Sequence, residues 1–153
     1  MDNKCLERSM IYQATVTRLD NNKTETYVGL CETDFKTRYS NHKTSLKHSN
    51  KRHSTELSKY VWTLKDNNTP HTITWKKLTT ATAYNNSTKR CNLCLQEKYY
   101  ILYKPHMASL NKRTEINNTC RHSRSYLLCH FRLKEPPLWG NNNQPIREKM
   151  ENN

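Results

Sequence analysis

Residues 11–18, Ile-Tyr-Gln-Ala-Thr-Val-Thr-Arg, and residues 24–30, Thr-Glu-Thr-Tyr-Val-Gly-Leu, determine the architecture expected for this chain. In the first segment, apolar and polar residues alternate from Tyr12 to Val16, which is the pattern of a half-buried strand. The second segment is rich in β-branched and aromatic residues, which favour strands. Between them, residues 19–23 tolerate positive φ and predict a turn. We therefore expect an antiparallel hairpin.

The sequence outside the hairpin predicts a mixture of helices with one more strand. Spacing of three and four residues between apolar side chains indicates helices, and Thr33, Asp34 and Ser54 are suitable caps for two of them. The predicted elements are, in order, strands at 11–18 and 24–30, helices at 33–47 and after Ser54, a strand at 71–78, a helix at 90–103 and a helical turn near 110–118.

This order, β-β-α-α-β-α, predicts a small α/β domain of the α+β type, with a three-stranded antiparallel sheet flanked by helices. Residues 1–9 are expected to form an N-terminal remnant or linker, and residues 10–133 the domain. Residues 134–153 are rich in Asn, Pro and Glu, so they predict a disordered tail.

The composition indicates a partner with negative charge. The 153 residues include 26 Lys and Arg against 13 Asp and Glu, which gives a net charge of +13. Each phosphate that a basic side chain neutralises releases counterions, so this excess favours nucleic acid. An anionic membrane surface and a merely soluble basic surface are the alternatives. The mean hydropathy of −1.08 predicts a small core.

The sequence also contains neither the apolar core of a signal peptide nor an apolar run near the ~20 residues of a membrane span. We therefore expect an intracellular, nuclear protein without a membrane partner. Six cysteines in such a chain favour metal binding or free thiols over disulfides.

Arg38 and His42 are four residues apart, so they project from one face of the predicted helix, among Phe35 and Tyr39. An arginine in this position would bind a phosphate through paired hydrogen bonds, and a histidine would transfer protons or bind phosphate. A solvated helix face with a stray aromatic residue is the alternative.

Glu97 falls where the helical spacing from Leu93 to Ile101 predicts a buried face. A lone buried carboxylate is costly unless it is paired or bound to metal. One interpretation is a partner lysine or arginine. The other is a ligand for Mg²⁺, which uses one or two carboxylates and keeps several waters.

The cysteines form one half of a zinc-site pattern. Cys91 and Cys94 have the Cys-x-x-Cys spacing, and Cys120 and His122 would supply the other two ligands. Buried free cysteines on two packed elements are the alternative. Outside this set, Cys31 is expected to be a small core residue, whereas Cys5 and Cys129 have no assigned role.

Together these residues resemble the GIY-YIG nuclease family over roughly residues 10–126. The first family motif matches at Met10-Ile11-Tyr12, with Met10 in place of glycine, and the second matches at Tyr27-Val28-Gly29. The family's helical arginine falls on Arg38, and a histidine one turn later on His42. Its metal-binding glutamate falls on Glu97, and its late asparagine on Asn111.

Three segments resemble, more narrowly, the endonuclease of Penelope-like retroelements. They are residues 11–16, 54–59 and 91–94. In that group the nuclease follows a reverse transcriptase, and this chain has no room for the polymerase.

The resemblance implies the GIY-YIG fold and a metal-dependent DNA endonuclease that leaves a 5′-phosphate and a 3′-hydroxyl, as in target-primed reverse transcription. Tyr12 with His42 would orient or deprotonate the attacking water, and Tyr27 would hold the phosphate or a metal-bound water. Glu97 would bind Mg²⁺ or Mn²⁺. Arg38 would stabilise the charge on the phosphate, and Asn111 would orient the phosphate or Glu97.

Double-stranded DNA is therefore the expected partner of a monomer that nicks, with a dimer needed only for double-strand cutting. Another class of function is a catalytically inactive, zinc-containing DNA- or RNA-binding module from a decayed element, which metal-dependent cleavage would distinguish. The basic residues expected to track phosphates include Lys36, Lys43, Lys47, Arg52, Lys112 and Arg113.

Overall fold

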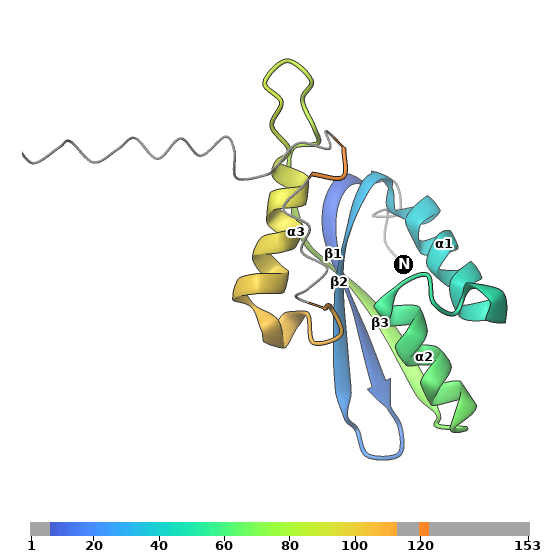
Figure 1. Ribbon diagram of the computed structural model, residues 1–153. Coiled ribbons are helices and arrows are strands. Elements are labelled where there is room, and N and C mark those ends of the chain that lie inside the picture. Colours follow the sequence, from blue (N-terminus) through green and yellow to red (C-terminus); the bar gives the residue numbers. More distant parts are fainter. Residues whose placement is uncertain (1–6, 113–119, 123–153) are drawn as a thin grey trace, which may run out of the picture.

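The computed structural model describes residues 7–112 and 120–122, which form a mixed α+β fold (Figure 1). The expectations for Cys5, Cys129, Arg113 and the tail at 134–153 lie outside the described residues. The elements are β1 (Arg8–Arg18), β2 (Thr24–Asp34), α1 (Phe35–Lys47), the 3₁₀ helix η2 (Ser49–Lys51), α2 (Glu56–Asp66), β3 (His71–Thr80), α3 (Asn92–Tyr103) and the 3₁₀ helix η3 (Pro105–Met107).

The α+β class and the three-stranded antiparallel sheet are confirmed, with the strand order β2-β1-β3. The observed element order differs from the predicted one because it contains the two 3₁₀ helices. Each has three residues, too few for a periodic pattern to be visible in a sequence. Among the described residues, no helix combines the length and apolar composition needed to cross a membrane.

The helices cover both faces of the sheet. Figure 1 shows α1 and α2 on one side of the strands and α3 on the other. On the first side, Tyr12 and Val16 of β1 pack with Leu57 of α2. On the second, Ile11 packs with Leu93 of α3. The sheet therefore separates two apolar clusters.

The expectation of a half-buried first strand is wrong for much of β1. Both Tyr12 and its neighbour Ile11 are fully buried, although they point to opposite faces. Gln13, the next residue on the face of Ile11, is also buried, and its side-chain amide donates to the carbonyl of Met107 at 2.8 Å. A polar residue can face a packed element when a backbone group satisfies it, which alternation alone does not reveal.

Several element ends also differ from their expected positions. β1 begins at Arg8, inside the segment expected to be a linker, and β2 continues to Asp34 instead of ending at Leu30. Asp34, one of the two expected caps, accepts a hydrogen bond from the Thr37 backbone N–H at 2.7 Å. α1 therefore begins at Phe35.

The second helix is capped one residue later than expected. Thr55, not Ser54, accepts the Ser58 backbone N–H at 3.1 Å, and the Ser58 hydroxyl accepts the Thr55 backbone N–H at 3.0 Å. This reciprocal capping box satisfies two backbone donors at once, so it outcompetes a single cap at Ser54.

Gly29 allows a close approach between neighbouring strands. It lies opposite Tyr12 in the β1–β2 register. A Cβ at position 29 would be 2.4 Å from the Tyr12 hydroxyl oxygen and 2.6 Å from Cζ. The close neighbour that Gly29 permits is thus the side chain of Tyr12.

We predict that Gly29→Ala destabilises the protein by about 1–3 kcal/mol, because the added methyl group overlaps the buried phenol of Tyr12. Urea unfolding of Gly29→Ala and of Gly29→Ala in a Tyr12→Ala background would measure the effect. The cost should be much smaller in the second background, where the phenol is absent. Equal costs in both backgrounds would contradict this interpretation.

Candidate functional site

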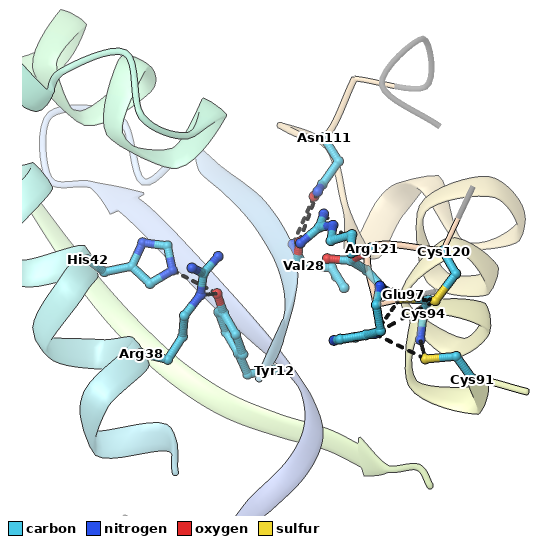
Figure 2. A network of polar contacts seen from close by, with 11 residues as sticks. Tyr12, Val28, Arg38, His42, Cys91, Cys94, Glu97, Asn111, Cys120 and Arg121 are labelled. Atoms are coloured by element: carbon cyan, nitrogen blue, oxygen red, sulfur yellow. Dashed lines mark hydrogen bonds and ion pairs between the residues drawn. The ribbon is translucent and has the colours of Figure 1, made fainter. Parts of the chain in front are cut away.

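Tyr12, Arg38 and His42 form a hydrogen-bonded cluster between β1 and α1 (Figure 2). The Tyr12 hydroxyl lies 2.7 Å from Nε2 of His42, and the Arg38 Nε–H donates to the same hydroxyl at 3.0 Å. Because Arg38 has no acceptor, the phenolic O–H is left to donate to His42. With the phenolic O–H as the donor, neutral His42 carries its proton on Nδ1.

Burial widens the pH range over which the tyrosine and the histidine stay uncharged. Burial raises the pKa of the Tyr12 hydroxyl and the nearby Tyr27 raises it further, while Arg38 only partly lowers it. Burial, followed by the charge of Arg38, lowers the pKa of His42 to about 4. At the Tyr12 hydroxyl, burial therefore outweighs the charge of Arg38, which disfavours Tyr12 as a base.

Aromatic rings enclose this cluster. The ring of Trp75 lies 5.2 Å from that of His42 and 5.9 Å from that of Tyr12, measured between centroids. Tyr27 meets His42 edge to face at 5.9 Å. Trp75 lies on β3 and packs against the apolar cluster on the α1 side of the sheet. Its register position opposite Ala14 on β1 also makes it a wall of the polar cluster.

Glu97 is buried, with 3% of its surface exposed, as its place in the helical pattern predicts. Its carboxylate pairs with the Arg121 guanidinium at 3.1 Å. Burial raises the pKa of Glu97, and Arg121 and a hydrogen bond from the Leu30 backbone oppose that shift. The arginine-partner interpretation therefore describes this structure, and Arg121 is a partner that sequence reasoning did not identify.

The site residues occur in two groups, one on each side of the strands. Figure 2 shows Tyr12, Arg38 and His42 on the side of α1, with Glu97 and Arg121 on the side of α3. The groups still interact electrostatically, because the charge of Glu97 raises the pKa values of both Tyr12 and Arg38.

Asn111 connects the segment after α3 to the edge strand. Its Oδ1 accepts the Val28 backbone N–H at 2.8 Å, and its Nδ2 donates to the Val28 carbonyl at 2.9 Å. Both ends of the amide are thus paired with β2 instead of with Glu97. The sequence could not reveal this partner, since the two residues are 83 positions apart.

Cys91, Cys94, Cys120 and His122 come together as predicted. Their ligand atoms all lie within 4.8 Å of one another. His122 Nδ1 is 3.3 Å from the sulfurs of Cys91 and Cys94, and the Cys94 and Cys120 sulfurs are 3.7 Å apart. Tetrahedral zinc, with bonds of ~2.3 Å to sulfur and ~2.0 Å to nitrogen, requires ligand separations of roughly 3.5–3.8 Å. The four residues therefore fit a zinc ion.

Neighbouring residues also suit a metal at this cluster. Glu32 lies 3.0 Å from Nε2 of His122, so it would hold that nitrogen protonated and leave Nδ1 for the metal. The Nζ atom of Lys98 is buried and has no hydrogen-bond partner within the described residues. Three thiolates and zinc carry a net charge of −1, which this ammonium would compensate.

Neither Glu32 nor Lys98 was recognised as part of the cluster from the sequence. Glu32 lies beyond the expected end of β2 and 90 positions from His122, and a single lysine next to a glutamate in a predicted helix is ordinary. The signal of the metal cluster that the sequence does contain is the Cys-x-x-Cys motif. In the structure this motif forms the first turn of α3, and Cys91 caps that helix.

The basic residues expected to contact DNA differ in their surroundings. Lys36, Lys43 and Lys47 are exposed along α1. Arg52 instead pairs with Asp66, and Lys112 lies 3.5 Å from Glu56. The α1 lysines therefore form the more accessible part of the expected phosphate-contacting set.

Comparisons with protein-family models, with curated proteins and with solved structures found no match for this chain.

We predict that the purified protein contains about one zinc ion per chain and that chelation or Cys120→Ala lowers its melting temperature by more than about 10 °C. The reason is that zinc binding to these four residues adds directly to the stability of the folded state. Elemental analysis and thermal unfolding measure both quantities. Cys31→Ser is the control, since Cys31 is buried outside the cluster. A zinc-free protein of full stability would exclude the metal site.

We also predict that acid destabilises the fold through His42. Its pKa of about 4 lies below the unfolded value of 6.5, so the unfolded state binds more protons between these values. As the pH falls from 6.5 toward 4, the free energy of unfolding should decrease by roughly 3 kcal/mol in total, because the stability contributed by neutral His42 is lost.

Urea unfolding across this pH range should be compared between the wild type and His42→Gln. The raised pKa of Glu97 acts in the opposite direction in both proteins, so the difference in slope isolates His42. Identical slopes would show that His42 titrates normally in the folded state.

Proposed function

We propose that this protein is a metal-dependent DNA endonuclease of the GIY-YIG type, similar to the endonuclease of Penelope-like retroelements. The observation that carries the proposal is the Tyr12–Arg38–His42 cluster, in which one phenol contacts both a guanidinium and a neutral imidazole. A net charge of +13 supports a phosphodiester substrate. The reaction would be hydrolysis that leaves a 5′-phosphate and a 3′-hydroxyl.

Arg38 is the phosphate-binding group in this proposal. A guanidinium has five N–H donors, and the bond to Tyr12 uses only the one on Nε. Its outer nitrogens are left to bind the oxygens of a phosphodiester and to stabilise the charge that develops there. Tyr12 therefore orients Arg38 by fixing its inner nitrogen.

Tyr12 is better suited to positioning than to water activation, which revises the expectation drawn from the sequence. Its side chain has no exposed surface, and its hydroxyl is occupied by Arg38 and His42. Tyr27 lies on the same sheet face, contacts the His42 ring and keeps 8% exposure. We therefore assign Tyr27 to orienting the attacking water, and His42, whose Nε2 lies 2.7 Å from the Tyr12 hydroxyl, to the role of base.

Glu97 is the residue that would hold Mg²⁺ or Mn²⁺. A single carboxylate with waters is a usual protein ligand set for magnesium, so the residue type fits. The bound ion would supply Lewis acidity for the leaving 3′ oxygen. The zinc cluster would have a structural role, because it joins the start of α3, which carries Glu97, to residues 120–122.

A zinc-containing nucleic-acid-binding module without activity is the second candidate. The pairing of Glu97 with Arg121 favours it, since that pair already neutralises the carboxylate without a metal. Both candidate functions would use the basic α1 surface to bind nucleic acid, but only the endonuclease would cleave it.

We predict that the protein nicks supercoiled plasmid in the presence of Mg²⁺, and that Arg38→Ala and Glu97→Ala each reduce the rate by about 10²–10³-fold. Losing a group that stabilises transition-state charge has an effect of this size. Gel separation of nicked from supercoiled DNA measures it.

Glu25→Gln is a matched control, because Glu25 lies on β2 and pairs with Lys23 at 3.0 Å, away from both groups. It should cleave like the wild type. Equal nicking by wild type and Glu97→Ala would refute the endonuclease assignment, and tight DNA binding without nicking would support the binding module.

A further inference from the structure

Arg121 lies between two members of the zinc cluster, Cys120 and His122, and its guanidinium pairs with Glu97. We propose that Arg121 is a built-in counter-ion that the zinc cluster places on Glu97, and that a divalent cation must displace it to bind. This inference rests on the proposed function, because it concerns the metal-binding step of the same site.

The covalent connection makes the placement of Arg121 depend on the cluster. Its two sequence neighbours are held by the cluster atoms, with the Cys120 sulfur 3.8 Å from His122 Nδ1. On the other side, α3 carries both Cys94 and, one turn later, Glu97. The zinc ligands therefore fix both the backbone that bears the guanidinium and the helix that bears the carboxylate.

The burial of the two partners is strongly unequal. The Glu97 side chain is 4% exposed, whereas that of Arg121 is 59% exposed. A buried carboxylate that stays ionised needs a positive partner, but an exposed guanidinium returns to water at little cost. Exchange of Arg121 for a metal ion would thus keep Glu97 neutralised throughout.

The Glu97 carboxylate cannot bind the Arg121 guanidinium and a divalent ion equally well at the same time. Arg121 Nη2 is 3.1 Å from Oε2 of Glu97, and a divalent ion on the same carboxylate would lie within a few ångströms of the guanidinium, where like charges repel. Divalent binding should therefore include the loss of this ion pair. Removing Arg121 should tighten divalent binding, and a lysine at this position should largely preserve competition.

The test is Mn²⁺ binding to the zinc-loaded full chain, measured from the electron paramagnetic resonance signal of free Mn²⁺. We expect Arg121→Ala to lower the dissociation constant about tenfold, which corresponds to about 1.4 kcal/mol. Arg121→Lys should remain within about threefold of the wild type. Arg90→Ala is the matched control, because it removes an exposed arginine next to the zinc ligand Cys91. It should leave the constant unchanged.

The Glu97→Gln variant separates the counter-ion inference from the metal assignment on which it rests. If it abolishes Mn²⁺ binding while Arg121→Ala binds no more tightly than the wild type, the counter-ion inference is overturned and the metal assignment stands. If Glu97→Gln binds Mn²⁺ as the wild type does, the metal assignment of Glu97 is overturned, and the counter-ion inference with it.

A stability measurement without added Mg²⁺ or Mn²⁺ keeps the test independent of the affinity of Glu97 for these ions. Urea unfolding of the zinc-loaded wild type, Glu97→Gln, Arg121→Ala and the double variant forms a double-mutant cycle. We expect Arg121→Ala to be clearly destabilising in the wild-type background and nearly neutral when position 97 is glutamine. Equal effects in both backgrounds would mean that the two side chains do not interact, and would overturn the inference.

Discussion

The contact between the Tyr12 phenol and the bare backbone of Gly29 is the constraint on which the rest of the site depends. It sets the depth at which the phenol lies against the sheet, because any side chain at position 29 would occupy its place. At that depth the hydroxyl reaches Arg38 and His42 of α1. The register of β1 against β2 thus determines where the Tyr12 hydroxyl meets the two polar residues of α1.

The class of fold and the local parts of the site were predictable because they arise from short-range patterns. Alternation along the first strand, the four-residue spacing of Arg38 and His42 and the turn between Cys91 and Cys94 all involve neighbours in sequence. Burial of both faces of β1 was missed because Gln13 lies on a packed face. The pairing of Glu32 with His122 and of Arg121 with Glu97 was missed because tertiary packing creates both pairs, and local spacing does not indicate either.

The two groups of site residues differ in what holds them in place. Tyr12, Arg38 and His42 are enclosed by aromatic rings, including Trp75, so apolar packing and burial control their protonation. Glu97 and Arg121 lie beside the cysteine cluster, where an ion pair opposes the effect of burial on the carboxylate. Between them is β2, the edge strand, which supplies Gly29 to one group and a Leu30 backbone hydrogen bond to the other.

The strand order β2-β1-β3 has a consequence for how the chain folds. β1 and β2 are joined by a short turn, so their pairing is local, and hairpins of this kind form within microseconds. β3 pairs with the other edge of β1 only after the chain has passed through α1 and α2. Closing such a long connection is entropically costly and slows folding. We therefore expect a hairpin-first folding order in which Trp75 covers Tyr12 late.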